Sequence, residues 1–143
     1  GETQTEFEKF MSDNGELENP QLKKDFDAII AAIKKIIDDC GARENLFRPE
    51  GNNIKAIPLC IEQRRGKGVG TLRLYCIRIS GKIIIIGNGG IKRVKRYEDD
   101  PILLDIVNKL RSIEHQIFIG TRKIHADYDD YQKVKMIIEA ISI

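Results

Sequence analysis

The segment from Thr71 to Ile86 constrains the fold of this chain more than any other part of the sequence. Apolar and polar residues alternate between Thr71 and Ile79, which is typical of a β-strand whose two faces differ. Ser80-Gly81 offers a tight turn, and four consecutive isoleucines follow at 83–86. We therefore predict an antiparallel hairpin. The isoleucine run predicts that the second strand is central and buried on both faces, and the glycine-rich residues 87–90 are expected to end it.

Amphipathic helices are predicted before the hairpin. Thr3 to Glu6 has the form of a capping box and precedes a short helix that Asn14-Gly15 closes. Asn19-Pro20 supplies an N-cap and a proline in the first turn of a second helix, which ends at Cys40-Gly41. The apolar stripe of this second helix is what packing against a sheet requires.

The same pattern returns after the hairpin. Asp100-Pro101 is predicted to start a third helix that runs to about Gln116. Residues 118–128 are compatible with either a loop or a strand. A terminal amphipathic helix is predicted from Tyr131 to Ile141.

One further strand is predicted at residues 54–59, where Pro58 confines it to an edge or an end. Together these elements predict an α+β fold, with N-terminal helices followed by a small antiparallel sheet and C-terminal helices. Residues 2–143 are expected to form a single domain, since 143 residues fit one hydrophobic core.

The composition gives no indication of a membrane, metal or cofactor site. No apolar run approaches the roughly 20 residues that cross a bilayer, and the first residues lack the features of a secretory signal. Cys40, Cys60 and Cys76 fit neither a zinc nor a disulfide spacing, which favours reduced thiols in the cytoplasm. His115 and His125 have no grouping of other ligands around them. We therefore expect a cytoplasmic protein with no membrane partner, no metal and no cofactor.

Positive charge is concentrated around the hairpin. Between Gln63 and Tyr97 there is no acidic residue and there are ten basic ones, namely Arg64, Arg65, Lys67, Arg73, Arg78, Lys82, Lys92, Arg93, Lys95 and Arg96. Such a surface suits a polyanion, most simply nucleic acid, although four bases within residues 92–96 are equally typical of a solvated surface.

The strand alternation favours the nucleic-acid interpretation. Leu72, Leu74 and Cys76 are expected to face the core, which leaves Arg73 and Tyr75 on the opposite face. We expect this pair to meet Lys92 and Arg93 on one solvent-accessible surface. Such a surface has guanidinium groups for phosphates and a phenol for base stacking.

Residues 72–101, LRLYCIRISGKIIIIGNGGIKRVKRYEDDP, follow the segment GARENLFRPEGNNIKAIPL. Over roughly residues 5–116 the chain resembles the RelE/ParE toxin superfamily, especially its HigB-like branch. The resemblance implies the toxin of a type II toxin-antitoxin system, a metal-independent endoribonuclease that cleaves mRNA, often on the ribosome, and is neutralised by a cognate antitoxin protein. In this chemistry the RNA 2′-hydroxyl attacks the adjacent phosphate.

The resemblance also implies roles for individual residues. Arg73 matches the sheet arginine that steadies the phosphorane, Arg93 belongs to a basic pair after the strand, and Tyr97 matches an aromatic that transfers a proton. The remaining RNA-binding residues are expected to be Lys55, Arg64, Arg65, Lys67, Tyr75, Lys92, Lys95 and Arg96. Two alternatives stay open: a noncatalytic nucleic-acid- or protein-binding module on the same fold, and a ParE-like inhibitor of a topoisomerase.

Overall fold

The structure is a computed structural model that describes residues 4–51, 53–59, 66 and 68–141. The helices and strands are, in chain order, α1 (Glu6–Asn14), α2 (Pro20–Lys35), β1 (Arg48–Pro49), β2 (Ile54–Ile57), β3 (Thr71–Arg78), β4 (Ile84–Lys92), α3 (Pro101–Lys123) and α4 (Tyr131–Ala140). A π-helical turn extends α2 to Cys40, and short 3-10 turns precede β1 and α3.

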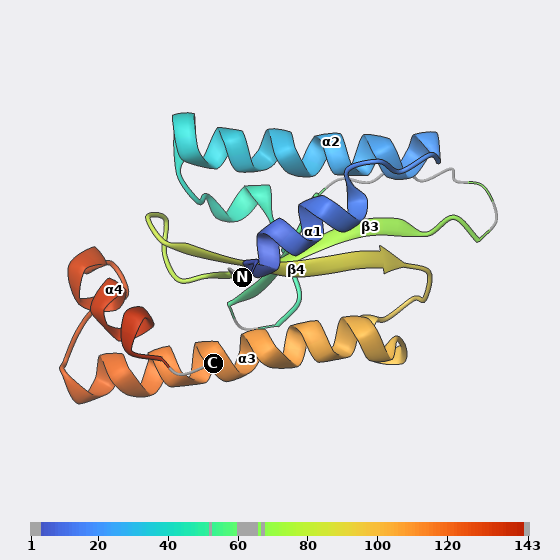
Figure 1. Cartoon of the computed structure of the whole chain (residues 1–143). Coiled ribbons are helices and arrows are strands. Elements are labelled where there is room, and N and C mark those ends of the chain that lie inside the picture. The colour runs from blue at the N-terminus through green and yellow to red at the C-terminus, as the bar shows by residue number, and fades with distance from the viewer. Residues whose placement is uncertain (1–3, 52, 60–65, 67, 142–143) are drawn as a thin grey trace.

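The strands form one antiparallel sheet in the order β1-β2-β3-β4. Helices α1 and α2 lie on one side of this sheet and α3 lies on the other, with α4 packed near the C-terminal end of α3 (Figure 1). The predicted α+β layout is therefore confirmed. None of the helices in the described part of the chain is both long and apolar enough to cross a bilayer.

Strand β3 contributes side chains to two hydrophobic cores, one on each face of the sheet. Leu72, Leu74 and Cys76 point toward α1 and α2, while Tyr75 and Ile77 point toward α3. All five side chains are buried because helices cover both faces of the sheet.

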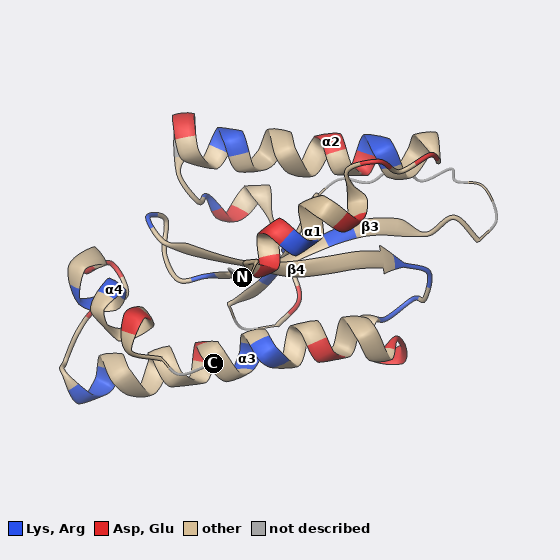
Figure 2. Cartoon of the chain, viewed as in Figure 1, with Lys and Arg blue, Asp and Glu red and all other residues tan. Residues whose placement is uncertain are grey.

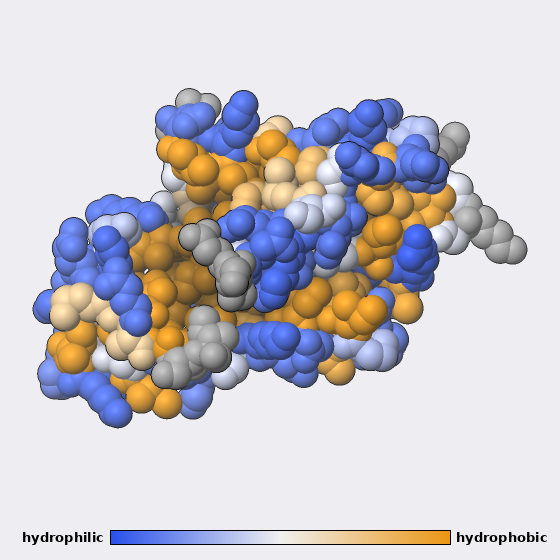
Figure 3. Space-filling view, in the orientation of Figure 1, coloured by the Kyte–Doolittle hydropathy of each residue, from blue (hydrophilic) through white to orange (hydrophobic). Residues whose placement is uncertain are grey.

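The prediction that the isoleucine strand is central was wrong. Strand β4 lies at the edge of the sheet, and Ile84, Ile85 and Ile86 are only half-buried. Apolar side chains therefore show between the two helix layers (Figure 3). A run of isoleucines predicts a strand whose two faces are both apolar. It does not predict that the strand has a neighbouring strand on each edge.

The glycines at 87–90 do not end β4, as we had predicted, and the strand continues to Lys92. Instead, these glycines allow β4 to lie close to β3 and to α3. A Cβ on Gly89 would collide with the carbonyl oxygen of Arg73, and one on Gly87 would lie 2.9 Å from the Leu110 side chain. The pairing of β3 with β4 is also irregular between Leu74 and Cys76.

Both predicted asparagine or aspartate caps are confirmed. The side chain of Asn19 accepts hydrogen bonds from the first turn of α2, and that of Asp100 does so for α3. Helix α3 runs to Lys123, well beyond the predicted end at Gln116. The extra turns bury one face against α4, where Gly120 lets Ile137 approach closely.

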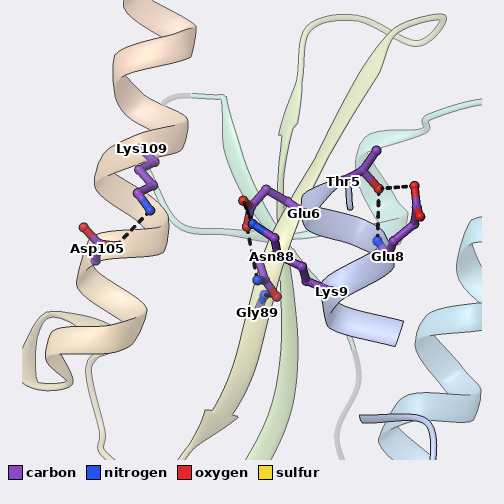
Figure 4. A network of polar contacts seen from close by, with 8 residues as sticks. All are labelled: Thr5, Glu6, Glu8, Lys9, Asn88, Gly89, Asp105 and Lys109. Atoms are coloured by element: carbon purple, nitrogen blue, oxygen red, sulfur yellow. Dashed lines mark hydrogen bonds and ion pairs between the residues drawn. The ribbon is translucent and has the colours of Figure 1, made fainter. Parts of the chain in front are cut away.

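The first helix begins at a different cap from the predicted one. Thr5 is the N-cap, and its hydroxyl accepts a hydrogen bond from the backbone N–H of Glu8 at 3.1 Å. Thr3 lies outside the described residues. The Glu6 carboxylate accepts a hydrogen bond from the Asn88 amide, which ties α1 to β4 (Figure 4).

The strand predicted at residues 54–59 is present but ends two residues earlier, just before its proline. Strand β2 covers Ile54–Ile57, and Pro58 follows it directly. The strand lies inside the sheet between β1 and β3, so Pro58 marks an end and not an edge.

We predict that Gly89→Ala lowers the free energy of unfolding by about 1–3 kcal/mol or more, because β3 and β4 must separate to admit a methyl group. Urea denaturation followed by circular dichroism measures this. The matched control is Gly81→Ala in the exposed turn, where the nearest atom to the added Cβ is the end of the Arg78 side chain at 3.8 Å. The control should change stability by less than about 0.5 kcal/mol. If both substitutions lowered the free energy of unfolding equally, the close contact of Gly89 with β3 would be contradicted.

Candidate functional site

A charged hollow of about 300 Å³ lies at the end of the sheet where β4 leads into the loop before α3. Lysine and arginine follow one another along this part of the chain (Figure 2). The residues that line the hollow are Arg48, Pro49, Glu50, Lys92, Lys95, Arg96, Tyr97 and Glu98. The lining thus combines four cations with two carboxylates, and Arg48 pairs with Glu50 while Arg96 pairs with Glu98.

Strand register explains why these residues meet. Paired residues of an antiparallel sheet point to the same face. Arg48 is opposite Ala56, which is opposite Tyr75, and Lys92 is opposite Thr71. Arg48 and Lys92 therefore project from the same face as Tyr75, the face that α3 covers farther along.

Arg73 belongs to this face but is not solvent-accessible, so that expectation was wrong. Only 2% of its surface is exposed. One guanidinium N–H donates to the carbonyl of Pro58 at 2.6 Å, and Nε has no hydrogen-bond partner. Burial lowers the pKa of Arg73 to about 10, and the charge of Arg48 contributes in the same direction. Among the described residues no carboxylate is within ion-pair distance of it.

Tyr75 is also buried, which contradicts its expected role as an exposed base-stacking residue. Its ring meets that of Tyr97 edge-on, with the centroids 6.1 Å apart. Burial raises the pKa of Tyr75, and its hydroxyl has no hydrogen-bond partner. Because β3 lies inside the sheet, its α3-facing side chains fill the core.

Arg111, a residue of α3 that the sequence analysis did not identify, holds the side chain of Tyr97 in place. A guanidinium N–H of Arg111 donates to the Tyr97 hydroxyl, and the same guanidinium lies 5.7 Å from the centre of the ring. Burial raises the pKa of Tyr97, so the phenol is neutral at physiological pH. Arg111 was missed because 14 residues of chain separate it from Tyr97.

Glu50 is the second missed residue. Its side chain is 11% exposed and lies 3.6 Å from the Arg48 guanidinium. Burial lowers the pKa of Lys92, and the charges of Arg48 and Arg73 lower it further, while Glu50 opposes them. The only sequence signal for Glu50 was its place between a helical region and a predicted strand.

Among the described residues, Lys55 and Arg93 were expected to bind or cleave RNA but do not line the hollow. Lys55 pairs with Cys76 and so projects from the opposite face of the sheet. Arg93 is exposed, and its Nε donates to the carbonyl of Gly68 at 3.0 Å, outside the hollow. Arg64, Arg65 and Lys67 lie outside the described residues. Lys92, Lys95, Arg96 and Tyr97 do line the hollow, but Arg73, Tyr75 and Arg93, which were expected to meet Lys92 on an exposed surface, do not.

Comparison with protein-family models, with curated proteins and with solved structures finds no match for this chain. In the described ranges, no group of three or more histidine, cysteine, aspartate or glutamate side chains is arranged to hold a metal ion. The expectation that the site works without a metal stays a prediction.

We predict that Arg73→Met leaves the free energy of unfolding unchanged or raises it by about 1 kcal/mol or more, because a buried guanidinium without an ion pair costs more than an apolar side chain of similar length. The control is Arg78→Met on the same strand. Arg78 donates to the carbonyl of Ala42 and pairs with Glu44 at 3.4 Å, so its loss should destabilise the protein. If urea denaturation shows Arg73→Met to be less stable by 1 kcal/mol or more, the guanidinium is structural.

Proposed function

We propose that this protein is the RelE/ParE-like toxin of a type II toxin-antitoxin system and cleaves mRNA in the charged hollow, with or without the ribosome. One observation carries the proposal. Arg48, Lys92, Lys95 and Arg96 line one hollow together with the largely buried side chain of Glu50, and the buried charge of Arg73 acts on Arg48, Glu50 and Lys92.

The cations account for binding. Phosphate contacts fix the position of an RNA backbone, and lysine and arginine supply most of them. The hollow of about 300 Å³ is at the lower end of the size range of ligand sites, which suits a phosphate and its ribose. The exposed Arg93 lies outside the hollow, so it contacts the backbone farther along instead of taking part in the chemistry.

The chemistry uses a proton acceptor, a proton donor and fixed positive charge. The 2′-oxygen forms a bond to phosphorus while the bond from phosphorus to the 5′-oxygen breaks, leaving a 2′,3′-cyclic phosphate and a 5′-hydroxyl. Glu50 takes the proton from the 2′-hydroxyl, and Lys92, with its lowered pKa, gives one to the 5′-oxygen.

Charge that develops on the phosphorane is opposed by groups already in place. Arg48 contributes from the wall of the hollow, and Arg73 contributes from the interior of the sheet. Tyr97 is a neutral phenol in an orientation fixed by Arg111, and so can donate a hydrogen bond to a phosphate oxygen.

The proposal includes a cognate antitoxin as the protein partner. The edge strand β4 offers the half-buried side chains of Ile84, Ile85 and Ile86 and carries no charged residue from Ile84 to Ile91. An edge strand with an apolar, uncharged stretch of this kind supports an interaction with another protein chain.

We predict that Glu50→Gln lowers the rate of RNA cleavage by about 100-fold or more, because it removes the proton acceptor. The control is Glu16→Gln on the exposed surface, which should cleave at the wild-type rate. Cleavage should be measured with purified protein, with and without ribosomes, and mass spectrometry should find a 2′,3′-cyclic phosphate. A chelator should have no effect, and a 2′-deoxy substitution at the cleaved nucleotide should block the reaction.

A requirement for added divalent metal would overturn this mechanism. If the wild-type protein binds RNA but neither cleaves it nor arrests growth, the protein is the noncatalytic module.

We also predict that RNA affinity falls steeply with salt concentration. The triple variant Lys92→Ala, Lys95→Ala and Arg96→Ala should flatten the logarithmic slope by about 2, since each phosphate contact to single-stranded RNA contributes about 0.7. The matched control replaces Lys23, Lys24 and Lys34 on the exposed side of α2 by alanine and should leave the slope unchanged. An equal change in both variants would show that RNA does not bind at the hollow.

A further inference from the structure

A second and larger cavity, of about 600 Å³, lies beside α3. Its lining residues are Asn53, Arg111, Glu114, His115, Phe118 and Tyr128. Arg111 connects this cavity to the charged hollow, because it also donates a hydrogen bond to Tyr97. The proposed reaction leaves this cavity unused.

Glu114 is an unusual lining residue because one oxygen of its carboxylate lacks a partner. Burial raises the pKa of Glu114, and only the backbone N–H of Asn53 and the charge of Arg111 offset it. Its Oε2 is buried and makes no hydrogen bond. The terminal torsion of a glutamate is soft, so a turn of the carboxylate can present this oxygen to a ligand. A ligand with N–H donors would satisfy it.

The remaining lining residues narrow the class of ligand. Arg111 and Glu114 are three residues apart on one helix and so lie on the same side of α3. A guanidinium and a carboxylate side by side match a planar group that has acceptors next to donors. Phe118 and Tyr128 add aromatic surface on which such a group can stack.

Guanine fits this pattern better than the other bases. Its N1–H and its 2-amino group are adjacent donors that pair with the two oxygens of a carboxylate, and its O6 and N7 accept from arginine. Adenine lacks the pair of adjacent donors, and cytosine and uracil offer a smaller stacking surface. Arginine has five N–H donors, so Arg111 can contact a base and still hold Tyr97.

We infer that the cavity binds a guanine base of single-stranded RNA next to the phosphate in the charged hollow, with Glu114 as the residue that reads the base. The inference rests on the proposed function for the identity of the substrate. It adds a sequence preference, which the resemblance and the hollow leave open.

Isothermal titration calorimetry with mononucleotides tests the cavity without any cleavage. GMP should bind at least tenfold more tightly than AMP, CMP or UMP, and IMP, which lacks the 2-amino group, should bind more weakly than GMP. Glu114→Gln should abolish the preference for GMP because an amide cannot accept both N–H groups. The control is Glu139→Gln, at an exposed site on α4, which should retain the preference.

A second variant guards against a folding defect. Phe118 is 43% exposed, so Phe118→Ala should fold, and it should weaken the binding of all nucleotides by about tenfold without changing their order. Equal binding of GMP and AMP, or no saturable binding of any nucleotide, overturns the base-binding site even if RNA is cleaved. If the protein prefers GMP but does not cleave RNA, the base-binding site is supported and the proposed nuclease activity is contradicted. With cleavage, replacing the guanines of a short RNA by adenines should lower the rate at least tenfold in the wild type but not in Glu114→Gln.

Discussion

Strand β3 is held between two helix layers, and the other parts of the molecule are arranged around it. Its side chains alternate between a core shared with α1 and α2 and a core shared with α3. The backbone N–H of Leu72, at its start, donates to the buried carboxylate of Asp25 on α2, which fixes the strand relative to that layer. Because Arg73 lies on this strand, its guanidinium is carried into the interior.

The burial of Arg73 is costly and needs an explanation. The guanidinium has one carbonyl partner, and burial lowers its pKa. A structural arginine would be expected to have a carboxylate beside it, as Arg78 has Glu44. An arginine whose charge acts on Lys92 and on the groups of a cationic hollow is better understood as a source of fixed positive potential. Preorganised charge of this kind has its largest effect where water is excluded.

Arg111 relates the two candidate binding sites to each other. It contacts Tyr97 at the wall of the charged hollow and lines the larger cavity beside Glu114. Helix α3 therefore lines the larger cavity directly and is linked to the charged hollow through the contact of Arg111 with Tyr97.

The features of this protein that could be predicted from its sequence are local ones. The caps at Asn19 and Asp100, the hairpin turn after β3 and the alternation along β3 were predictable because each depends on residues that are neighbours in the chain. Lys92, Lys95, Arg96 and Tyr97 lie within six consecutive positions, so their nearness in the chain was visible in the sequence, although the hollow they line was not.

The neighbours of these local features in space follow from the packing of the sheet and helices. The edge position of β4, the burial of Arg73, and the projection of Lys55 from the opposite face follow from strand order, register and the covering of both faces by helices. Glu50 and Arg111 join the site across long stretches of chain. Such contacts depend on how complete layers pack, and no pattern among neighbouring residues encodes them.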